Sequence, residues 1–173
     1  MASIFVTGAT GVIGRRLLPL LSAAGHTVTA VGRSPAKRAA IERAGARPIE
    51  LDLFDSARVR EAITGHEVIV NLATHIPPTS RMFFPGAWRE NDRIRRDGSR
   101  ILVEAAIAAG AARFVQESFA PMYAEGGEEW IDERARRGLQ RDRRRARAQA
   151  RVRGRAGGSA GRGGAALRSR LAR

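Results

Sequence analysis

Thr7-Gly8-Ala9-Thr10-Gly11-Val12-Ile13-Gly14 is the stretch that decides the fold of this chain. Ser3-Ile4-Phe5-Val6, directly before it, has the apolar composition of a short β-strand, and a helical apolar pattern runs from Val12 to Ala24 after it. In a turn that joins a strand to a helix, Gly8 permits the tight bend and Gly14 lets the helix pack close to the strand.

The same glycines predict an anion site. Gly11 leaves space for a pyrophosphate to reach the backbone. The first N–H groups of a helix have no acceptor within the helix, and the helix dipole places positive charge there. A glycine-rich turn in this strand–turn–helix context predicts dinucleotide binding. The alternative is that the glycines only join a strand to a helix.

Length and composition narrow the class of protein. A chain of 173 residues predicts one domain with a hydrophobic core. There is no cysteine, so disulfides and thiolate metal sites are excluded, and we predict no metal site. We find no signal-peptide pattern at the amino terminus and no apolar stretch of membrane-spanning length. We therefore expect a cytoplasmic protein with no membrane partner; its oligomeric state is left open.

The net charge of +14 comes from the last forty residues. Residues 1–133 contain 16 basic and 16 acidic side chains, which cancel. Residues 134–173 contain 15 arginines and one acid, Asp142, and 31 of these 40 residues are Arg, Ala or Gly. We therefore expect a globular domain over residues 1–133, followed over residues 134–173 by a basic tail that is disordered or partly helical.

Strand-like and helix-like segments alternate along the domain. Alternation of this kind predicts a parallel sheet with helices on both faces and right-handed crossovers. We expect a doubly wound α/β sheet of about five strands, in the order 3-2-1-4-5 when strands are counted along the chain. After the first strand and helix, the predicted strands are 27–31, 48–51, 67–73 and 113–118, and the predicted helices are 35–44, 56–64 and 88–109.

A series of motifs follows the same order as the predicted strands and helices. The motifs are the 7–14 turn, Asp52-Leu53, Asn71-Leu72-Ala73, Asn91 with Gly98, and Phe114-Val115-Gln116-Glu117-Ser118. Together they resemble the NAD-dependent epimerase/dehydratase family, which comprises extended or atypical short-chain dehydrogenase/reductases. The resemblance covers about residues 3–133. It implies a Rossmann-type sheet that binds NAD(P), and oxidation, reduction or epimerisation at a carbinol, with a nucleotide sugar as one candidate substrate.

The resemblance also implies which residues bind the cofactor. Asp52 and Leu53 would contact the adenine, and Ala73 would lie beside a ribose. The alternative for Asp52 is a cap at the end of a strand, and the alternative for Leu53 is a place in the core. The alternative for Asn71 is a structural role, in which its side chain forms a hydrogen bond with nearby backbone. The predicted cofactor-binding residues are Gly8, Thr10, Gly11, Val12, Ile13, Gly14, Arg33, Lys37, Asp52, Leu53, Asn71 and Ala73.

Arg33 and Lys37 favour NADP(H) over NAD(H). A carboxylate at the end of the second strand would accept hydrogen bonds from a ribose 2′-hydroxyl. This chain has Gly32-Arg33-Ser34 there, and Lys37, its only lysine, follows closely. Two cations without a carboxylate suit a 2′-phosphate. The alternative is that both are solvated charges of a loop and a helix.

The catalytic residues that the resemblance implies are incomplete. Ser118 corresponds to the family's catalytic Ser/Thr, and Asn91 to a structural position near the active site. In the family, a lysine follows the proton-transferring tyrosine by four residues. Here Tyr123 is the only tyrosine and Gly127 stands four residues after it, so we do not assign Tyr123 as the proton donor. We expect weak cofactor binding without turnover; an atypical reductase that needs no Tyr/Lys pair is the alternative.

The basic tail has three interpretations. Arg, Ala and Gly have GC-rich codons, so a reading-frame shift near the codon for Arg134 would explain why the family pattern stops at about Glu133. Codons can be chosen for 139–145 and 161–168 such that a one-base shift restores family-like sequence. The tail is otherwise a binding module for RNA or an acidic partner, or a solvated extension. It contains no aromatic residue, so we expect at most non-specific RNA contact.

A shortened sheet would leave the fifth strand as an open edge. An apolar edge invites pairing with other chains, so we expect low stability and aggregation. The long helix would also lose the tyrosine-bearing helix that packs beside it in the family, so we expect Ile101, Leu102, Ala105 and Ala106 to be partly exposed.

Overall fold

The computed structural model describes residues 1–118. Predictions about Tyr123 and the basic tail lie outside the described residues. Met1–Glu117 form one compact unit, and Ser118 is the first residue of a second. The elements, in order, are β1 (Ser3–Thr7), α1 (Gly14–Ala23), β2 (Thr27–Val31), α2 (Pro35–Arg43), β3 (Arg47–Ile49), α3 (Ser56–Ile63), β4 (Val68–Asn71), α4 (Arg89–Arg93), the π-helical turn η1 (Ile94–Gly98), α5 (Ser99–Ala108) and β5 (Arg113–Gln116).

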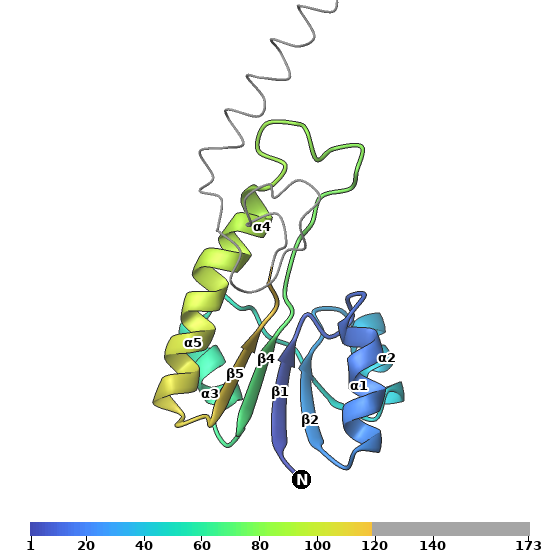
Figure 1. Cartoon of the computed structure of the whole chain (residues 1–173), viewed down its shortest axis with the longest axis vertical. Coiled ribbons are helices and arrows are strands. Elements are labelled where there is room, and N and C mark those ends of the chain that lie inside the picture. Colours follow the sequence, from blue (N-terminus) through green and yellow to red (C-terminus); the bar gives the residue numbers. More distant parts are fainter. Residues whose placement is uncertain (119–173) are drawn as a thin grey trace, which may run out of the picture. The chain divides into compact units, whose positions relative to one another are not determined.

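The strands form one parallel sheet in the predicted order, β3-β2-β1-β4-β5. On β1, Val6 pairs with Ala30 of β2 on one side and with Val70 of β4 on the other. Helices α1 and α2 cover one face of the sheet, and α3 and α5 cover the opposite face (Figure 1). The predicted Rossmann-type doubly wound fold is therefore confirmed.

Each face of the sheet has its own apolar core. Leu18 of α1 and Ile41 of α2 pack in one core, and Val59 of α3 and Leu102 of α5 pack in the other. Strand β1 lies between the two cores, and Phe5 is fully buried. This position explains why β1 is apolar on both faces, as central parallel strands are.

The long helix differs from the prediction in two ways. Its path runs through α4, η1 and α5, so a π-helical turn interrupts it. The expected exposure of Leu102, Ala105 and Ala106 is wrong, because these side chains are buried in the core that α5 shares with α3. The large apolar side chains of this helix that are exposed are Val103, at 37%, and Ile107, at 75%.

The helix starts follow local chemistry. Ser34 caps α2 by accepting a hydrogen bond from the Lys37 N–H, with Pro35 in the first helical position. Helix α1 begins at Gly14 rather than Val12, so Ile13 is the N-cap and is 54% exposed. Within the described residues, no helix has the length and apolar composition needed to cross a membrane.

Candidate functional site

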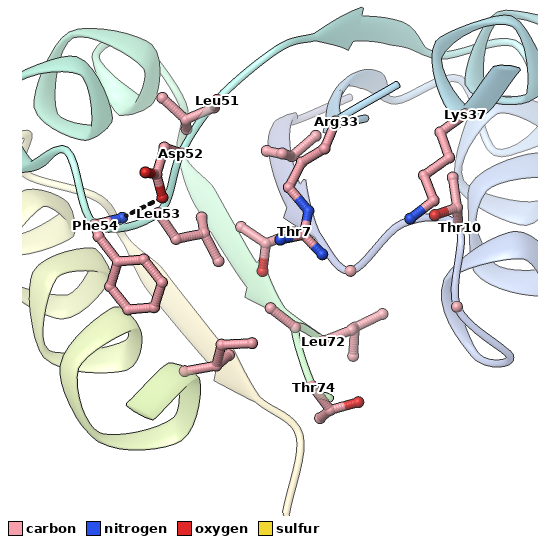
Figure 2. Close-up of a pocket in the computed structure, with 15 residues that line it drawn as sticks. Thr7, Thr10, Arg33, Lys37, Leu51, Asp52, Leu53, Phe54, Leu72 and Thr74 are labelled. Carbon is pink, nitrogen blue, oxygen red and sulfur yellow. Dashed lines mark hydrogen bonds between the residues drawn. The ribbon is translucent and has the colours of Figure 1, made fainter. Parts of the chain in front are cut away.

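A cavity of about 240 Å³ lies where the carboxyl ends of β1, β2 and β4 meet the chain that follows β3. This volume is just below the roughly 300 Å³ at which small-molecule pockets begin, so it would enclose only part of a dinucleotide. In Figure 2, Arg33 reaches across the middle of the cavity, with Lys37 on one side and Asp52 and Phe54 on the other. The lining residues are Thr7, Gly8, Thr10, Gly11, Val31, Arg33, Lys37, Leu51, Asp52, Leu53, Phe54, Leu72, Ala73, Thr74 and Ile94.

The turn after β1 has no space for larger residues at two glycines. Gly8 has a φ of +66°, and a Cβ there would lie 2.2 Å from the carbonyl oxygen of Leu72. A Cβ on Gly14 would lie 2.5 Å from the carbonyl oxygens of Gly8 and Ala9. The close approaches explain both glycines: Gly8 lets β1 turn beside the end of β4, and Gly14 seats α1 against the turn.

The start of α1 fits an anion. No side chain caps the helix at Ile13, and its first turn contains no acidic residue. The first-turn N–H groups of a helix lack intrahelical acceptors. Gly11 is exposed, and its N–H donates to the carbonyl oxygen of Gly8 at 3.0 Å, which closes the turn. The N–H groups of Arg15 and Arg16 donate to the carbonyl oxygens of Gly11 and Ile13, so within residues 1–118 the N–H groups of Val12, Ile13 and Gly14 are the ones left to bind a phosphate group.

Arg33 and Lys37 are two exposed cations on the cavity wall. Neither forms an ion pair with any of the described residues. Arg38, only one residue after Lys37, differs because it pairs with Glu50 and also donates to the carbonyl oxygen of Gly32. The site thus has two positive charges that no described carboxylate neutralises.

The chain after β3 forms the apolar side of the cavity. Leu51 is buried, and Leu53 and Phe54 are half-buried. The Phe54 N–H donates to Oδ1 of Asp52 at 3.0 Å, which fixes the turn (Figure 2). The exposed Asp52 carboxylate lies next to these apolar side chains and can accept hydrogen bonds from a polar edge of a ligand.

The Asn71 side chain connects the carboxyl ends of three strands, its own β4 and its neighbours β1 and β5, through hydrogen bonds. Its Oδ1 accepts hydrogen bonds from the hydroxyl of Thr7 and from the N–H of Ala73. Its Nδ2 donates to Oγ of Ser99 and Oε1 of Gln116, at 3.1 and 2.9 Å. Asn71 is buried and does not line the cavity, so its observed contacts fit the structural alternative that the sequence left open.

Asn91 holds the next part of the same segment. It is buried on α4, and its Oδ1 accepts a hydrogen bond from the N–H of His75 at 3.1 Å. Two buried amide side chains therefore fix the chain on both sides of Thr74, which lines the cavity. This contact agrees with the structural position that the resemblance implies for Asn91.

The cavity brings together eight of the twelve predicted cofactor-binding residues. They are Gly8, Thr10, Gly11, Arg33, Lys37, Asp52, Leu53 and Ala73. Four others, Val12, Ile13, Gly14 and Asn71, do not line it. Sequence reasoning missed seven lining residues, although Thr7, Leu51, Phe54, Leu72 and Thr74 directly adjoin predicted ones. Val31 ends β2, a position that does signal a site, whereas no sequence pattern indicates Ile94.

The predicted catalytic residue, Ser118, is not among the lining residues of this cavity. Ser118 is exposed and stands two residues after β5. Its neighbour Glu117 pairs with Arg95 of η1, and the Glu117 N–H donates to the carbonyl oxygen of Asn71. Hydrogen bonds from Arg96 hold the pKa of Asp97 below its usual range, but this exposed pair also lies outside the cavity.

Comparison with known proteins identifies the family. Residues 8–155 match the NAD(P)H-binding family, and the chain belongs to it. The 3-diazoavenalumate denitrifying reductase of a Streptomyces species is 37% identical over 134 residues, which cover 76% of this chain and 42% of the reductase. L-Arabinose 1-dehydrogenase (NAD(P)(+)) of Haloferax volcanii is 34% identical over 115 residues, which cover 66% of this chain and 40% of the dehydrogenase. The chain thus spans about two fifths of these relatives.

Solved structures with the same fold include NAD-bound epimerases. UDP-glucose 4-epimerase from Bifidobacterium longum, in complex with NAD+ and UDP, has a TM-score of 0.66 and 19% identity, and the match covers 79% of this chain and 42% of the epimerase. UDP-glucose-4-epimerase from Stenotrophomonas maltophila, with bound NAD, has a TM-score of 0.65 and 23% identity over 80% of this chain and 43% of the epimerase. These similarities confirm the predicted fold, and the family match over residues 8–155 confirms an NAD(P)H-binding family.

Proposed function

We propose that this member of the NAD(P)H-binding family binds NADP(H) and forms the cofactor-binding part of an oxidoreductase or epimerase. The observation that carries the proposal is that Gly8 and Gly11, in the turn that leads to the uncapped start of α1, line one cavity together with Arg33 and Lys37, which have no ion-pair partner among the described residues. The chemistry matches the parts of a dinucleotide phosphate: backbone N–H groups suit the pyrophosphate, and cations suit the 2′-phosphate.

The lining residues indicate an orientation for the cofactor. The pyrophosphate would lie on the 7–14 turn, and the 2′-phosphate between Arg33 and Lys37 after β2. The adenine would lie against the apolar chain after β3, with Asp52 as an acceptor for its polar edge. The remaining half of the cofactor would extend from the turn past Ala73 and Thr74. When bound, the nicotinamide ring supplies hydride transfer.

The reaction itself is a narrower proposal. The names of the two curated relatives, a reductase and a dehydrogenase, favour hydride transfer for an intact relative. This chain has no Tyr-x-x-x-Lys, and Ser118 remains its one predicted catalytic residue. We therefore propose binding without turnover. The alternative is an atypical reductase, which steady oxidation of NADPH with a carbonyl substrate would support.

Fluorescence titration of the full chain with NADPH and NADH tests the proposed function. Replacing one exposed cation at a phosphate costs about 1 kcal/mol, so Arg33→Ser or Lys37→Ser should weaken NADPH binding about fivefold and leave NADH binding unchanged. Arg38→Gln is the matched control, because it removes an equal charge one position from the lining cation Lys37, at a residue that pairs with Glu50 and does not line the cavity. No binding of either nucleotide would refute the proposal.

The arginine-rich segment carries a separate proposal. We propose that the cofactor-binding domain comprises residues 1–133 and that residues 134–173 are non-native sequence from a reading-frame shift. The concentration of 15 arginines in this segment supports it, and also makes non-specific RNA contact a second candidate property. The gene sequence tests the frame shift. A single-base change near the codon for Arg134 should restore family-like sequence, and the proposal is refuted if no such change does so. Filter binding over a salt series tests RNA contact.

A further inference from the structure

We propose that Phe54, held in place by Arg93, forms a wall of the adenine subsite. This inference rests on the proposed cofactor binding and assigns two residues that the family resemblance does not include. Phe54 lines the cavity and is half-buried. The guanidinium carbon of Arg93 lies 3.7 Å from the centroid of the Phe54 ring. One face of the ring is therefore covered by a cation while another part of the ring lines the cavity.

The contact joins two elements that are far apart in the sequence. Arg93 is the last residue of α4, and Ile94, the first residue of η1, is itself a lining residue. The same helical segment thus supplies one lining residue, Ile94, and through Arg93 a support for another lining residue, Phe54. A cation over an aromatic face is attracted to the negative charge of the π system, so Arg93 restricts the ring to fewer orientations.

The backbone on both sides of Phe54 is also fixed. Its own N–H donates to Oδ1 of Asp52 at 3.0 Å. Oδ1 of Asp55, the next residue, accepts from the N–H of Arg58 at 3.1 Å and caps α3. A ring restrained at its backbone and at its face loses little further freedom when a ligand binds, so Phe54 is preorganised.

The neighbours of Phe54 indicate a planar apolar ligand group. Leu51 and Leu53 lie on the same side of the cavity as Phe54, whereas the exposed cations Arg33 and Lys37 lie in another part of it (Figure 2). Ile94 is a further apolar lining residue. In a dinucleotide phosphate the group next to the 2′-phosphate-bearing ribose is the adenine base. Bases bind to aromatic side chains through their faces, and this contact contributes to affinity without hydrogen-bond readout.

Two variants with matched controls test the inference in the full chain. Phe54→Leu keeps an apolar wall but removes the ring, and Arg93→Gln removes the cation from an exposed position. The controls are Phe83→Leu, at a ring that is 76% exposed and outside the cavity, and Arg113→Gln, at an exposed residue that begins β5. We measure the Kd for NADPH by fluorescence, and saturation transfer by NMR from the protein to the adenine H2 and H8 protons and to the nicotinamide protons.

Phe54→Leu should raise the Kd about tenfold, a typical loss for one base–aromatic stack. It should also reduce saturation transfer to the adenine protons relative to the nicotinamide protons. Arg93→Gln should raise the Kd about threefold with the same NMR change, and Arg93→Lys should restore part of the affinity. Both controls should leave the Kd and the NMR ratio unchanged.

The outcomes separate this inference from the proposed function. If the unmodified chain binds NADPH and Phe54→Leu changes neither the Kd nor the adenine signal, the inference is overturned and the proposed function stands. An equal loss of signal at both ends of the cofactor would also overturn it. If only Arg93→Gln is without effect, the role of Arg93 is wrong. If the unmodified chain binds neither NADPH nor NADH, the proposed function fails and this subsite fails with it.

Discussion

Replacing Asn71 with leucine should destabilise the protein by about 3 kcal/mol. The buried hydroxyl of Thr7 loses its acceptor, which costs roughly 1–3 kcal/mol. Each other lost hydrogen bond costs about 0.5–1.5 kcal/mol. The Asn71 side chain makes four hydrogen bonds, to Thr7, Ala73, Ser99 and Gln116. Gln116 is exposed and Ser99 is half-buried, so water recovers part of the loss at those two residues. The total is a large share of the 5–15 kcal/mol that stabilises a typical domain.

Urea denaturation followed by circular dichroism measures this loss. The matched control is Thr7→Val, which removes the buried hydroxyl and keeps its shape. In the double variant the unsatisfied hydroxyl is absent, so its destabilisation should fall short of the sum of the two single variants by about 1 kcal/mol or more. A loss below about 0.5 kcal/mol for Asn71→Leu, as for an ordinary surface substitution, would refute the reasoning. Strict additivity in the double variant would refute it as well.

Three further predictions concern the turn, the sheet edge and a helix cap. Gly8→Ala should lower the free energy of unfolding by about 2 kcal/mol or more and weaken NADPH binding, because the φ of Gly8 is +66° and the added Cβ would lie 2.2 Å from the Leu72 carbonyl oxygen. Urea denaturation measures the stability, and titration at matched folded fraction measures the binding. A variant as stable as the unmodified chain would contradict this prediction. Val115→Lys should slow aggregation, since Val115 is 44% exposed on the last strand of the sheet, and light scattering that does not change would count against an edge-pairing route. Ser34→Ala should lower the stability by about 1 kcal/mol through loss of the α2 cap, which a thermal melt can detect, and an unchanged Tm would show that the cap is not needed.

The sheet could be predicted because its residues carry strong local signals. Ile4, Phe5 and Val6 are apolar on both faces of β1, and all three are buried. The strand–helix alternation then fixed the parallel order that the structure has. The π-helical turn at 94–98 could not be predicted, because a change of hydrogen-bond partner along a helix leaves no distinct apolar pattern. Leu102 is buried because α5 packs against α3. The expectation that Leu102 would be partly exposed did not take this contact into account.

The site residues that follow the ends of strands could be predicted from the sequence. Gly8, Arg33, Asp52 and Ala73 follow the ends of β1, β2, β3 and β4, and all four line the cavity. Phe54 and Ile94 line it because α4 and η1 pack beside the turn after β3, a tertiary contact with no local signal. The sequence likewise could not decide whether Asn71 binds the cofactor or has a structural role. The structure shows that Asn71 does not line the cavity and accepts a hydrogen bond from the Ala73 N–H.

The ratio of the Kd values for NADH and NADPH, measured on the full chain and on Arg33→Glu, tests the central claim most directly. We predict that the unmodified chain binds NADPH more tightly, because Arg33 and Lys37 line the cavity without a carboxylate partner among the described residues. Arg33→Glu places a carboxylate at the end of β2 and should reverse the preference. Failure of the unmodified chain to bind either nucleotide, or equal affinities that Arg33→Glu does not change, would contradict the account.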